Sequence, residues 1–246
     1  MGILDFLSAE KREARRLGRI VKRANNKYTP KDYRQVALQE MIDEARRGNA
    51  IALSGLLARF AVCAEPSIED EEEKEWVHDA LVEIGPPALP YIRRALRSAE
   101  SVVWVQRVFK SIVTPEEYKG ELLDVLLGFD TEYERNPDRK MQTVMALAEV
   151  PGHDVAEALL RFLTDVDETV RFQTVVALAR HADEVAREPL LKAICDDESI
   201  RVRNIAIESF ANLGWVTTGF KKKTESLLPA GYTQDKSGRI IKIGSP

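Results

Sequence analysis

Side chains that could carry out catalysis or bind metal are few in this sequence, and they are scattered. The histidines are His78, His153 and His181, and the cysteines are Cys63 and Cys195. We identify no second metal ligand at helical spacing from any histidine, whereas a metal site needs several convergent ligands. There is also no glycine-rich phosphate loop and no nucleophile elbow. The sequence therefore predicts no catalytic site, no metal and no cofactor, and it predicts that both cysteines are small core residues.

A cluster of arginines followed by a tryptophan is the first candidate for binding a partner. It consists of Arg93, Arg94, Arg97 and Trp104. Such a cluster could bind phosphate or an acidic peptide. Acidic residues on neighbouring predicted helices, Glu121, Asp124 and Glu157, interrupt any longer positive track. We therefore favour a solvated charged face over a nucleic-acid track.

Two other internal segments are candidates for partner contact. The loop 128–136 is longer than the other predicted connections and offers Phe129 and Tyr133 as anchors. The alternative is that this loop only spans a wider gap between helices. The segment 65–75 holds seven acidic residues, which suit the positive end of a helix dipole or form an acidic ridge.

The two ends of the chain are basic. Residues 1–26 predict an amphipathic helix whose cations include Arg12, Arg15, Arg16 and Arg19. We favour a cap or a partner-binding helix; the alternative is contact with an anionic membrane surface, with Phe6 and Leu7 inserted. Near the other end, the turn signal at 235–238 between two short apolar segments predicts a small hairpin.

The overall composition is that of a folded, helical protein. The 246 residues are 44% hydrophobic and 31% charged, with a formal net charge of −4. This charge argues against coating by nucleic acid. Two distant cysteines indicate a reducing, cytoplasmic setting, and no apolar segment reaches the roughly 18 residues of a membrane span.

Internal repeats organise the chain. QTVMALA at 142–148 returns as QTVVALA at 173–179, and an acidic residue before each helix moves in step at Glu134, Asp165 and Asp197. A helix that is apolar around most of its circumference needs neighbours on several sides, as in a stack of repeats. The predicted helices are 3–26, 30–47, 49–62, 69–84, 86–98, 100–113, 115–128, 137–149, 153–164, 168–180, 184–195, 199–213 and 219–228.

Three segments carry a resemblance to a known family. They are DVDETVRFQTVVALA at 165–179, DESIRVRNIAIESFANLG at 197–214 and HDALVEIGPPALPYIRRAL at 78–96. Together they resemble the HEAT-repeat family, including the HEAT-like repeats of phycobilisome lyases. The resemblance is strong over 69–214 and weaker over 30–62. It implies a solenoid fold and leaves the activity open, because such solenoids include scaffolds, nucleic-acid binders and a few enzymes.

The resemblance also implies a role for four charged residues. Asp165, Arg171, Asp197 and Arg203 are expected to form a ladder in which each side chain bonds to the adjoining repeat. The alternative is a charged groove that binds a ligand. The iron-binding hydroxylases among HEAT proteins use repeated His-Glu pairs, and this sequence has none.

We therefore expect an all-α solenoid of about six helix pairs at 30–228, after a basic helix at 1–29 and before a tail at 229–246. The expected function is a non-catalytic cytoplasmic scaffold or adaptor that binds protein partners, with peripheral membrane contact as an option. The alternative is a nucleic-acid-binding solenoid related to DNA repair, and a third interpretation is an enzyme similar to a bilin lyase.

Overall fold

The computed structural model describes residues 3–243, with side chains from Lys11 onward. Thirteen α-helices and one two-stranded sheet lie in these residues, which confirms the predicted all-α solenoid. Contacts among the helices divide the chain into two compact units, Met1–Tyr118 and Lys119–Pro246. The division lies within the helix α7 (Pro115–Leu127), and each terminal segment packs onto the neighbouring helices of its own unit.

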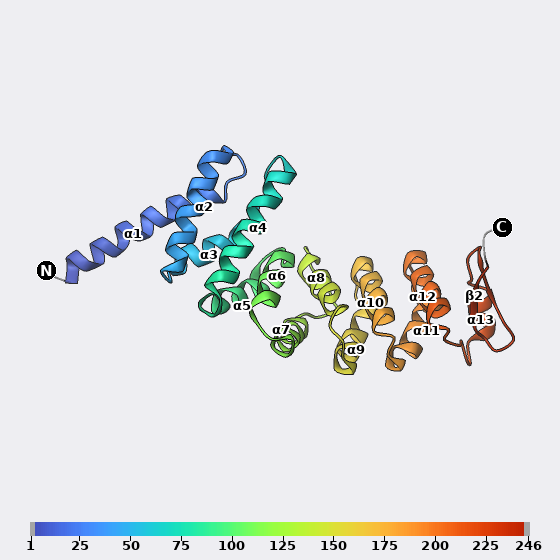
Figure 1. The fold of residues 1–246 in the computed structure, drawn as a ribbon. Helices are drawn as coiled ribbons and strands as arrows, with labels where there is room; N and C mark the ends of the chain where they lie inside the picture. Colours follow the sequence, from blue (N-terminus) through green and yellow to red (C-terminus); the bar gives the residue numbers. More distant parts are fainter. Residues whose placement is uncertain (1–2, 244–246) are drawn as a thin grey trace. The chain divides into compact units, whose positions relative to one another are not determined.

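The first unit is a stack of helix pairs preceded by a long helix. Its elements are α1 (Ile3–Ala24), α2 (Lys31–Arg46), α3 (Ala50–Arg59), α4 (Ser67–Ile84), η1 (Pro86–Ala88), α5 (Leu89–Ser98) and α6 (Val103–Ile112), and α7 (Pro115–Leu127) begins at its end. The first helices of the pairs, α2, α4 and α6, pack in that order, and the second helices α3 and α5 pack on each other (Figure 1). Each pair thus buries its apolar faces against the next pair.

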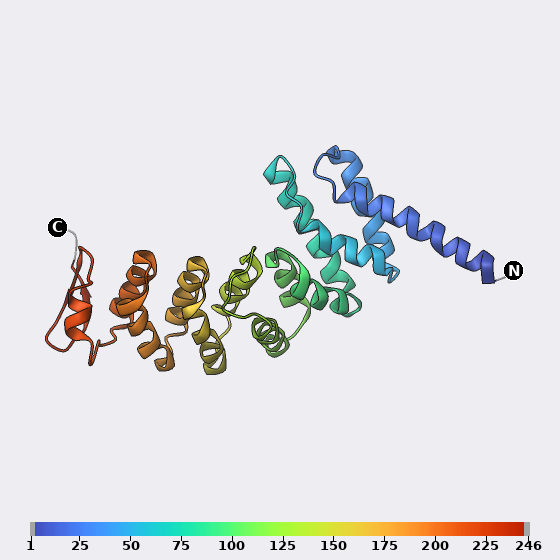
Figure 2. The same cartoon turned by 180° about the vertical axis from the view of Figure 1, so that it is seen from behind.

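The second unit repeats this arrangement and ends in a hairpin. Its elements after α7 are α8 (Asp138–Leu147), α9 (His153–Leu159), η2 (Leu160–Thr164), α10 (Glu168–His181), η3 (Glu184–Ala186), α11 (Arg187–Asp196), α12 (Ile200–Leu213), α13 (Lys221–Glu225), β1 (Tyr232–Gln234) and β2 (Ile240–Lys242). Helices α8, α10 and α12 stand side by side in one row when seen from the front and from behind (Figures 1 and 2). The duplicated QTVMALA and QTVVALA segments lie in α8 and α10, so they form the packing surface of adjacent repeats.

Side-chain caps fix the starts of several helices. Asp167 and Ser199 each accept backbone N–H bonds from the second and third residues after them, at the starts of α10 and α12. Thr114 and Glu117 form a reciprocal capping box at the start of α7. Helix α2, in contrast, begins after Pro30 without a side-chain cap bond.

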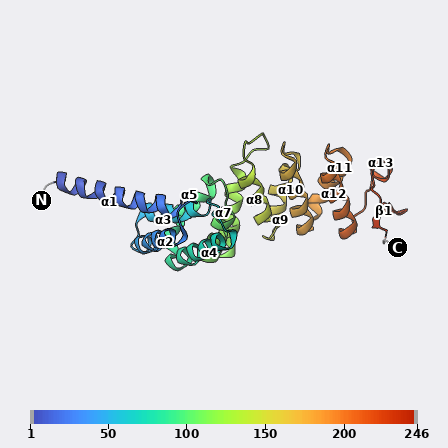
Figure 3. The same cartoon turned by 90° about the horizontal axis from the view of Figure 1, so that it is seen from above.

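The N-terminal helix α1 covers the end of the first unit. It packs on both α2 and α3, with Leu17, Ile20 and Ala24 buried. Gly55 of α3 permits this close approach, because a Cβ at that position would lie 2.7 Å from a methyl group of Val21. Figures 1 and 3 show the N-terminal part of α1 extending past α2 and α3.

The predicted C-terminal hairpin is confirmed, and it covers the last long helix of the second unit. Strand β2 packs on α12, where Ile240 is buried. The rings of Phe210 and Trp215 meet edge to face at 5.5 Å beside it. The preceding helix α13 spans only five residues and is shorter than the helix expected at 219–228.

Candidate functional site

A row of charged side chains joins successive helix pairs of the second unit. We call Lys140, Asp165, Arg171 and Asp197 the inter-repeat ladder. Arg203 was expected to belong to it, but within the described residues it bonds to backbone carbonyls at the start of its own repeat and not to the adjoining one. Arg171 donates through Nε and Nη2 to the two carboxylate oxygens of Asp197, at 2.9 and 3.2 Å. One repeat earlier, Lys140 Nζ donates to Asp165 Oδ2 at 2.8 Å. Both ion pairs are almost fully buried, so each basic residue fixes its repeat to the acidic residue of the next.

The remaining hydrogen-bonding capacity of the ladder is used within the repeats. Arg171 donates to the carbonyl of Asp165 at 2.9 Å, and Arg203 donates to the carbonyl of Asp197 at 2.7 Å. Asp165 and Asp197 each accept a backbone N–H from two residues further on. Burial lowers the pKa of Arg171, but the bond from its guanidinium to Asp197 outweighs this and the pKa is raised. These bonds serve the stacking of repeats.

The first unit holds a second buried charge cluster, which the sequence did not reveal. We call Arg34, Arg59, Asp70, Glu73 and Lys74 the buried ionic network. Arg34 Nε donates to Glu73 at 2.7 Å, and Arg59 Nη2 donates to Asp70 and Glu73 at 2.6 and 2.9 Å. Burial raises the pKa of Asp70, but bonds from Lys74 and Arg59 outweigh it and the pKa is lowered. Helices α2, α3 and α4 are therefore joined by buried ion pairs.

Two residues of the acidic segment 65–75 are thus turned inward rather than forming part of an exposed ridge. Asp70 and Glu73 are buried, whereas Glu71 and Glu72 are exposed. The available signal was spacing: residues three or four apart share a helix face, and this face continues to the buried Val77. A run of acids hides that signal because every position carries a charge.

The three arginines of α5 make different contacts. Arg93 lies over the ring of Phe109 at 5.8 Å, and Arg97 donates to the carbonyl of Arg93 at 3.2 Å. Arg94 alone lines a groove, described below. The basic cluster predicted from sequence is therefore divided between different surroundings.

Two of the aromatic residues proposed as partner anchors are core residues instead. Trp104 is 9% exposed and stacks on Phe60 at 5.6 Å, with the rings 5° from parallel. Phe129 is 6% exposed and lies under the guanidinium of Arg139 at 5.1 Å. Burial prevents either ring from meeting a partner, so this expectation is corrected. Tyr133 is exposed, as a contact residue must be.

The loop 128–136 is tied down at several points, as expected of a spacer between repeats. The carbonyl of Thr131 accepts the backbone N–H of Val166, and the carbonyl of Glu132 accepts Lys140 Nζ at 3.3 Å. The carbonyl of Phe129 accepts Arg161 Nη2 at 2.9 Å. These bonds support the spacer interpretation of the loop, with Tyr133 at its surface.

The cations of α1 divide into two groups. Arg16 forms ion pairs with Glu13 and with Glu44 of α2, at 2.7 and 2.6 Å. Arg12, Arg15 and Arg19 are exposed. The predicted lipid contacts Phe6 and Leu7 lie outside the described side chains. Within the described residues, no helix is long and apolar enough to cross a membrane.

A groove of the first unit lies between α3 and α5, and we call it the α3–α5 groove. It has a volume of about 290 Å³ and is lined by Ser54, Leu57, Ala58, Ala61, Tyr91, Arg94, Ala95, Ser98, Ala99 and Ser101. These positions recur every three or four residues, so each helix contributes one continuous face. The opposite faces hold buried leucine and isoleucine side chains, which fix the spacing of the two helices.

Arg94 is the one ionisable cation of this groove. Its side chain is exposed and forms no ion pair with any residue that the structure describes. The other lining side chains are small, apolar or hydroxyl-bearing. Small residues let a partner backbone come close, and a guanidinium binds a carboxylate through two parallel bonds. The α3–α5 groove is therefore suited to a peptide segment that carries an acidic side chain.

The corresponding groove of the second unit, between η2 and α11, has the opposite charge. It has a volume of about 580 Å³, and its lining includes Leu160, Leu163, Pro189 and Lys192 together with the acidic residues Asp165, Asp196, Asp197 and Glu198. Arg171 also lines it but is bonded to Asp197. The two units thus present grooves of different chemistry at equivalent positions of their repeats.

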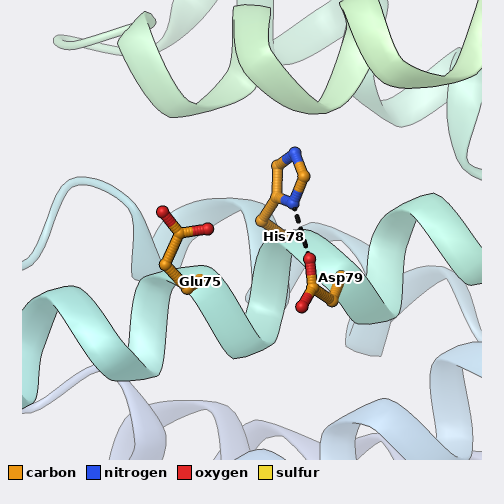
Figure 4. A group of neighbouring side chains, drawn as sticks. All are labelled: Glu75, His78 and Asp79. Atoms are coloured by element: carbon orange, nitrogen blue, oxygen red, sulfur yellow. Dashed lines mark hydrogen bonds and ion pairs between the residues drawn. The ribbon is translucent and has the colours of Figure 1, made fainter.

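One cluster in the described chain has the composition of a metal site. Glu75, His78 and Asp79 of α4 each offer one ligand atom, all within 4.8 Å of one another (Figure 4). The expectation that no histidine has a ligand at helical spacing is therefore corrected. Arg107 donates to Glu75 at 2.8 Å, and His78 Nδ1 lies 3.0 Å from Asp79. A cation would have to displace Arg107, so the observed role of the cluster is to join α4 to α6.

His153 forms the most evident pH-sensitive contact. Its Nδ1 lies 2.7 Å from Asp183 Oδ2, and its Nε2 lies 3.4 Å from Glu157. The bond to Asp183 and the charge of that carboxylate raise the pKa of His153. The ion pair connects α9 to the turn between the two helices of the next pair, where Asp183 caps η3.

The comparisons with known proteins address the repeats. No curated protein matches this chain in sequence. Human deoxyhypusine hydroxylase, solved in complex with glycerol, is similar over 92% of this chain and 95% of its own, at 14% identity and a TM-score of 0.36. A TM-score this low supports no conclusion about activity. Residues 130–211 match the family described as HEAT repeats, without singling out the phycobilisome-lyase type. Residues 130–211 of this chain therefore carry HEAT repeats.

Proposed function

We propose that this protein is a non-catalytic scaffold that binds an acidic helical segment of a protein partner in the α3–α5 groove. The observation that carries the proposal is Arg94, an exposed guanidinium without an ion pair in the described chain, set between two faces of small side chains. HEAT repeats supply a rigid helical framework, which reduces the ordering cost of binding. An amphipathic helix laid between two helices is an established mode of peptide recognition.

The chemistry of the groove supports binding rather than catalysis. Its polar side chains are the hydroxyls of serine and tyrosine and the guanidinium of Arg94. A hydrolytic or transfer site needs a nucleophile beside a base, or a general acid–base pair within hydrogen-bond reach. Leu57 and Tyr91 instead offer apolar surface on either side of Arg94.

We also propose the cellular compartment in which this scaffold acts. Cys63 is exposed, so the expectation that both cysteines are core residues is wrong for Cys63, whereas Cys195 is buried; both are free thiols. An exposed free thiol is compatible with a reducing compartment such as the cytoplasm. We therefore place the interaction there.

A selection from displayed helical peptides tests the proposal. The full-length protein is the bait, and bound peptides are counter-selected on Ala58→Gln, which fills the groove with a longer side chain. We expect the recovered peptides to share an acidic residue flanked by small or apolar residues and to bind Ala58→Gln at least tenfold more weakly. Gln39→Ala on α2 is the control, because Gln39 is exposed and lies outside the groove. Peptides that bind Ala58→Gln as well as the natural protein would contradict the proposal.

A further inference from the structure

The side of α1 that faces away from α2 and α3 carries a line of cations. We call Lys11, Arg15, Arg19 and Lys22 the α1 basic stripe. All four are exposed, and they lie on the opposite side of the helix from the buried Leu17, Ile20 and Ala24. At 1.5 Å per residue the stripe is about 16 Å long. It is therefore an outward surface that the first unit does not use for packing.

The stripe cations differ from their neighbour Arg16 in having no acidic partner among the residues that the structure describes. Arg16 is bound by Glu13 and Glu44. None of the four stripe cations forms an ion pair with the residues that the structure describes. Helix positions three and four residues from Arg15 are occupied by Lys11, Arg12, Gly18 and Arg19, which leaves no local counter-charge. Such a line of like charges repels itself along the helix, and a bound anion would relieve that repulsion.

A glycine lies in the middle of the stripe. Gly18 is exposed, and a Cβ added to it would meet nothing within 4 Å. Glycine in a helix interior costs about 0.5–1 kcal/mol relative to alanine, and no packing contact accounts for it here. Arg15, Gly18, Arg19 and Lys22 together line a shallow depression. A ligand can therefore reach the helix backbone between the cations.

The side chains around the α1 basic stripe indicate which class of ligand can bind there. Insertion into a lipid surface needs apolar side chains beside the cations, and a protein hot spot needs aromatic anchors. Along residues 11–24 the exposed side chains are charged except for Ala14 and Gly18. A line of cations without either feature matches a repeating chain of phosphates, where contacts position the ligand without reading its sequence.

We infer that the α1 basic stripe binds the phosphodiester backbone of a nucleic acid, independently of base sequence. Phosphates lie along the stripe, and one of them fits into the depression over Gly18 between Arg15 and Arg19. This site is separate from the α3–α5 groove, so the protein has one surface for a protein segment and another for a nucleic acid.

Fluorescence anisotropy with labelled 20-nucleotide strands and duplexes of two unrelated sequences tests this inference on the full-length protein. With four phosphates neutralised, raising the salt from 50 to 200 mM should weaken binding about 50-fold for single strands and about 150-fold for duplexes. The two sequences should bind equally well. Arg15→Gln/Arg19→Gln/Lys22→Gln should lose most of the affinity, whereas Lys192→Gln/Lys222→Gln/Lys236→Gln, with the same change in net charge, should keep it.

The variant Gly18→Gln changes the shape of the depression without changing the charge of the α1 basic stripe. Glutamine favours a helix more than glycine does, so the fold is retained and the cations are unchanged. We expect a five- to tenfold loss of affinity, because the side chain fills the depression. Equal binding by the stripe variant and its control would overturn the inference. Binding to phosphatidylserine vesicles that depends on the stripe, without binding to either nucleic acid, would also overturn it and assign the stripe to a membrane surface.

Discussion

Arg171 and Asp197 lie on successive helix pairs and are joined by two hydrogen bonds of 2.9 and 3.2 Å. The Asp197 side chain is only 5% exposed, so its charge depends on Arg171 for compensation. We expect Arg171→Met to lower the free energy of unfolding by about 3–5 kcal/mol, because removing one partner leaves a buried charge unpaired. Urea unfolding followed by far-UV circular dichroism measures this loss.

Arg203 provides the matched control for the ladder. It donates to backbone carbonyls at the equivalent position but forms no ion pair within the described chain. Arg203→Met should therefore cost only about 1–2 kcal/mol. Equal losses for the two variants would show that the ion pair does not determine the stability of the stack.

The buried ionic network makes an equivalent prediction for the first unit. Glu73 is 1% exposed and accepts bonds from Arg34 and Arg59. Glu73→Gln keeps the shape of the side chain but removes its charge, so we expect a loss of about 3–5 kcal/mol in the free energy of unfolding. Glu72→Gln, one residue away and exposed, should change stability by less than about 0.5 kcal/mol. The prediction is wrong if both substitutions have the same small effect.

The His153–Asp183 pair predicts how stability depends on pH in the second unit. The pKa of His153 is higher in the folded protein than in the unfolded chain. The stabilisation that His153 gives to the fold is therefore complete below the unfolded pKa, and it is lost as the pH rises through the folded pKa. A hydrogen bond from the backbone N–H of Val185 and the bond with His153 lower the pKa of Asp183. The stabilisation that Asp183 gives to the fold is therefore lost as the pH falls through this lowered pKa. The pair therefore stabilises the fold at mildly acidic pH.

Substitution of His153 isolates this contribution. The effect is small because the side chain is exposed. We expect His153→Gln to flatten the change in unfolding midpoint between neutral and mildly acidic pH, and NMR titration of the imidazole to show the raised pKa. An imidazole that titrates at the value of an unperturbed histidine would contradict the pairing.

The repeat architecture could be predicted from sequence because the features that define it involve residues close together in the chain. The spacing of QTVMALA and QTVVALA and the turn before Ile240 depend on residues close in the chain. The hairpin and the helix order followed from these signals. The shortening of α13 did not follow from them.

The candidate site was less accessible to sequence analysis, because it depends on which way each side chain faces. Arg93, Arg94 and Arg97 look equivalent in sequence, yet only Arg94 lines the groove. Trp104 was expected at a surface and stacks on Phe60, 44 residues earlier by number. Such pairings arise from the stacking of repeats and leave no periodic signal in the chain.

The central claim is that Arg94 in the α3–α5 groove binds an acidic residue of a protein segment. Isothermal titration of a selected acidic peptide tests it most directly, with the natural protein, Arg94→Glu, and the control Lys110→Glu, which has the same charge change outside the groove. We predict that Arg94→Glu raises the dissociation constant at least tenfold, which corresponds to about 1.4 kcal/mol. Replacing the acidic residue of the peptide by arginine should restore binding to Arg94→Glu. Equal affinity for the natural protein and Arg94→Glu, with no rescue by the exchanged charges, would contradict the account.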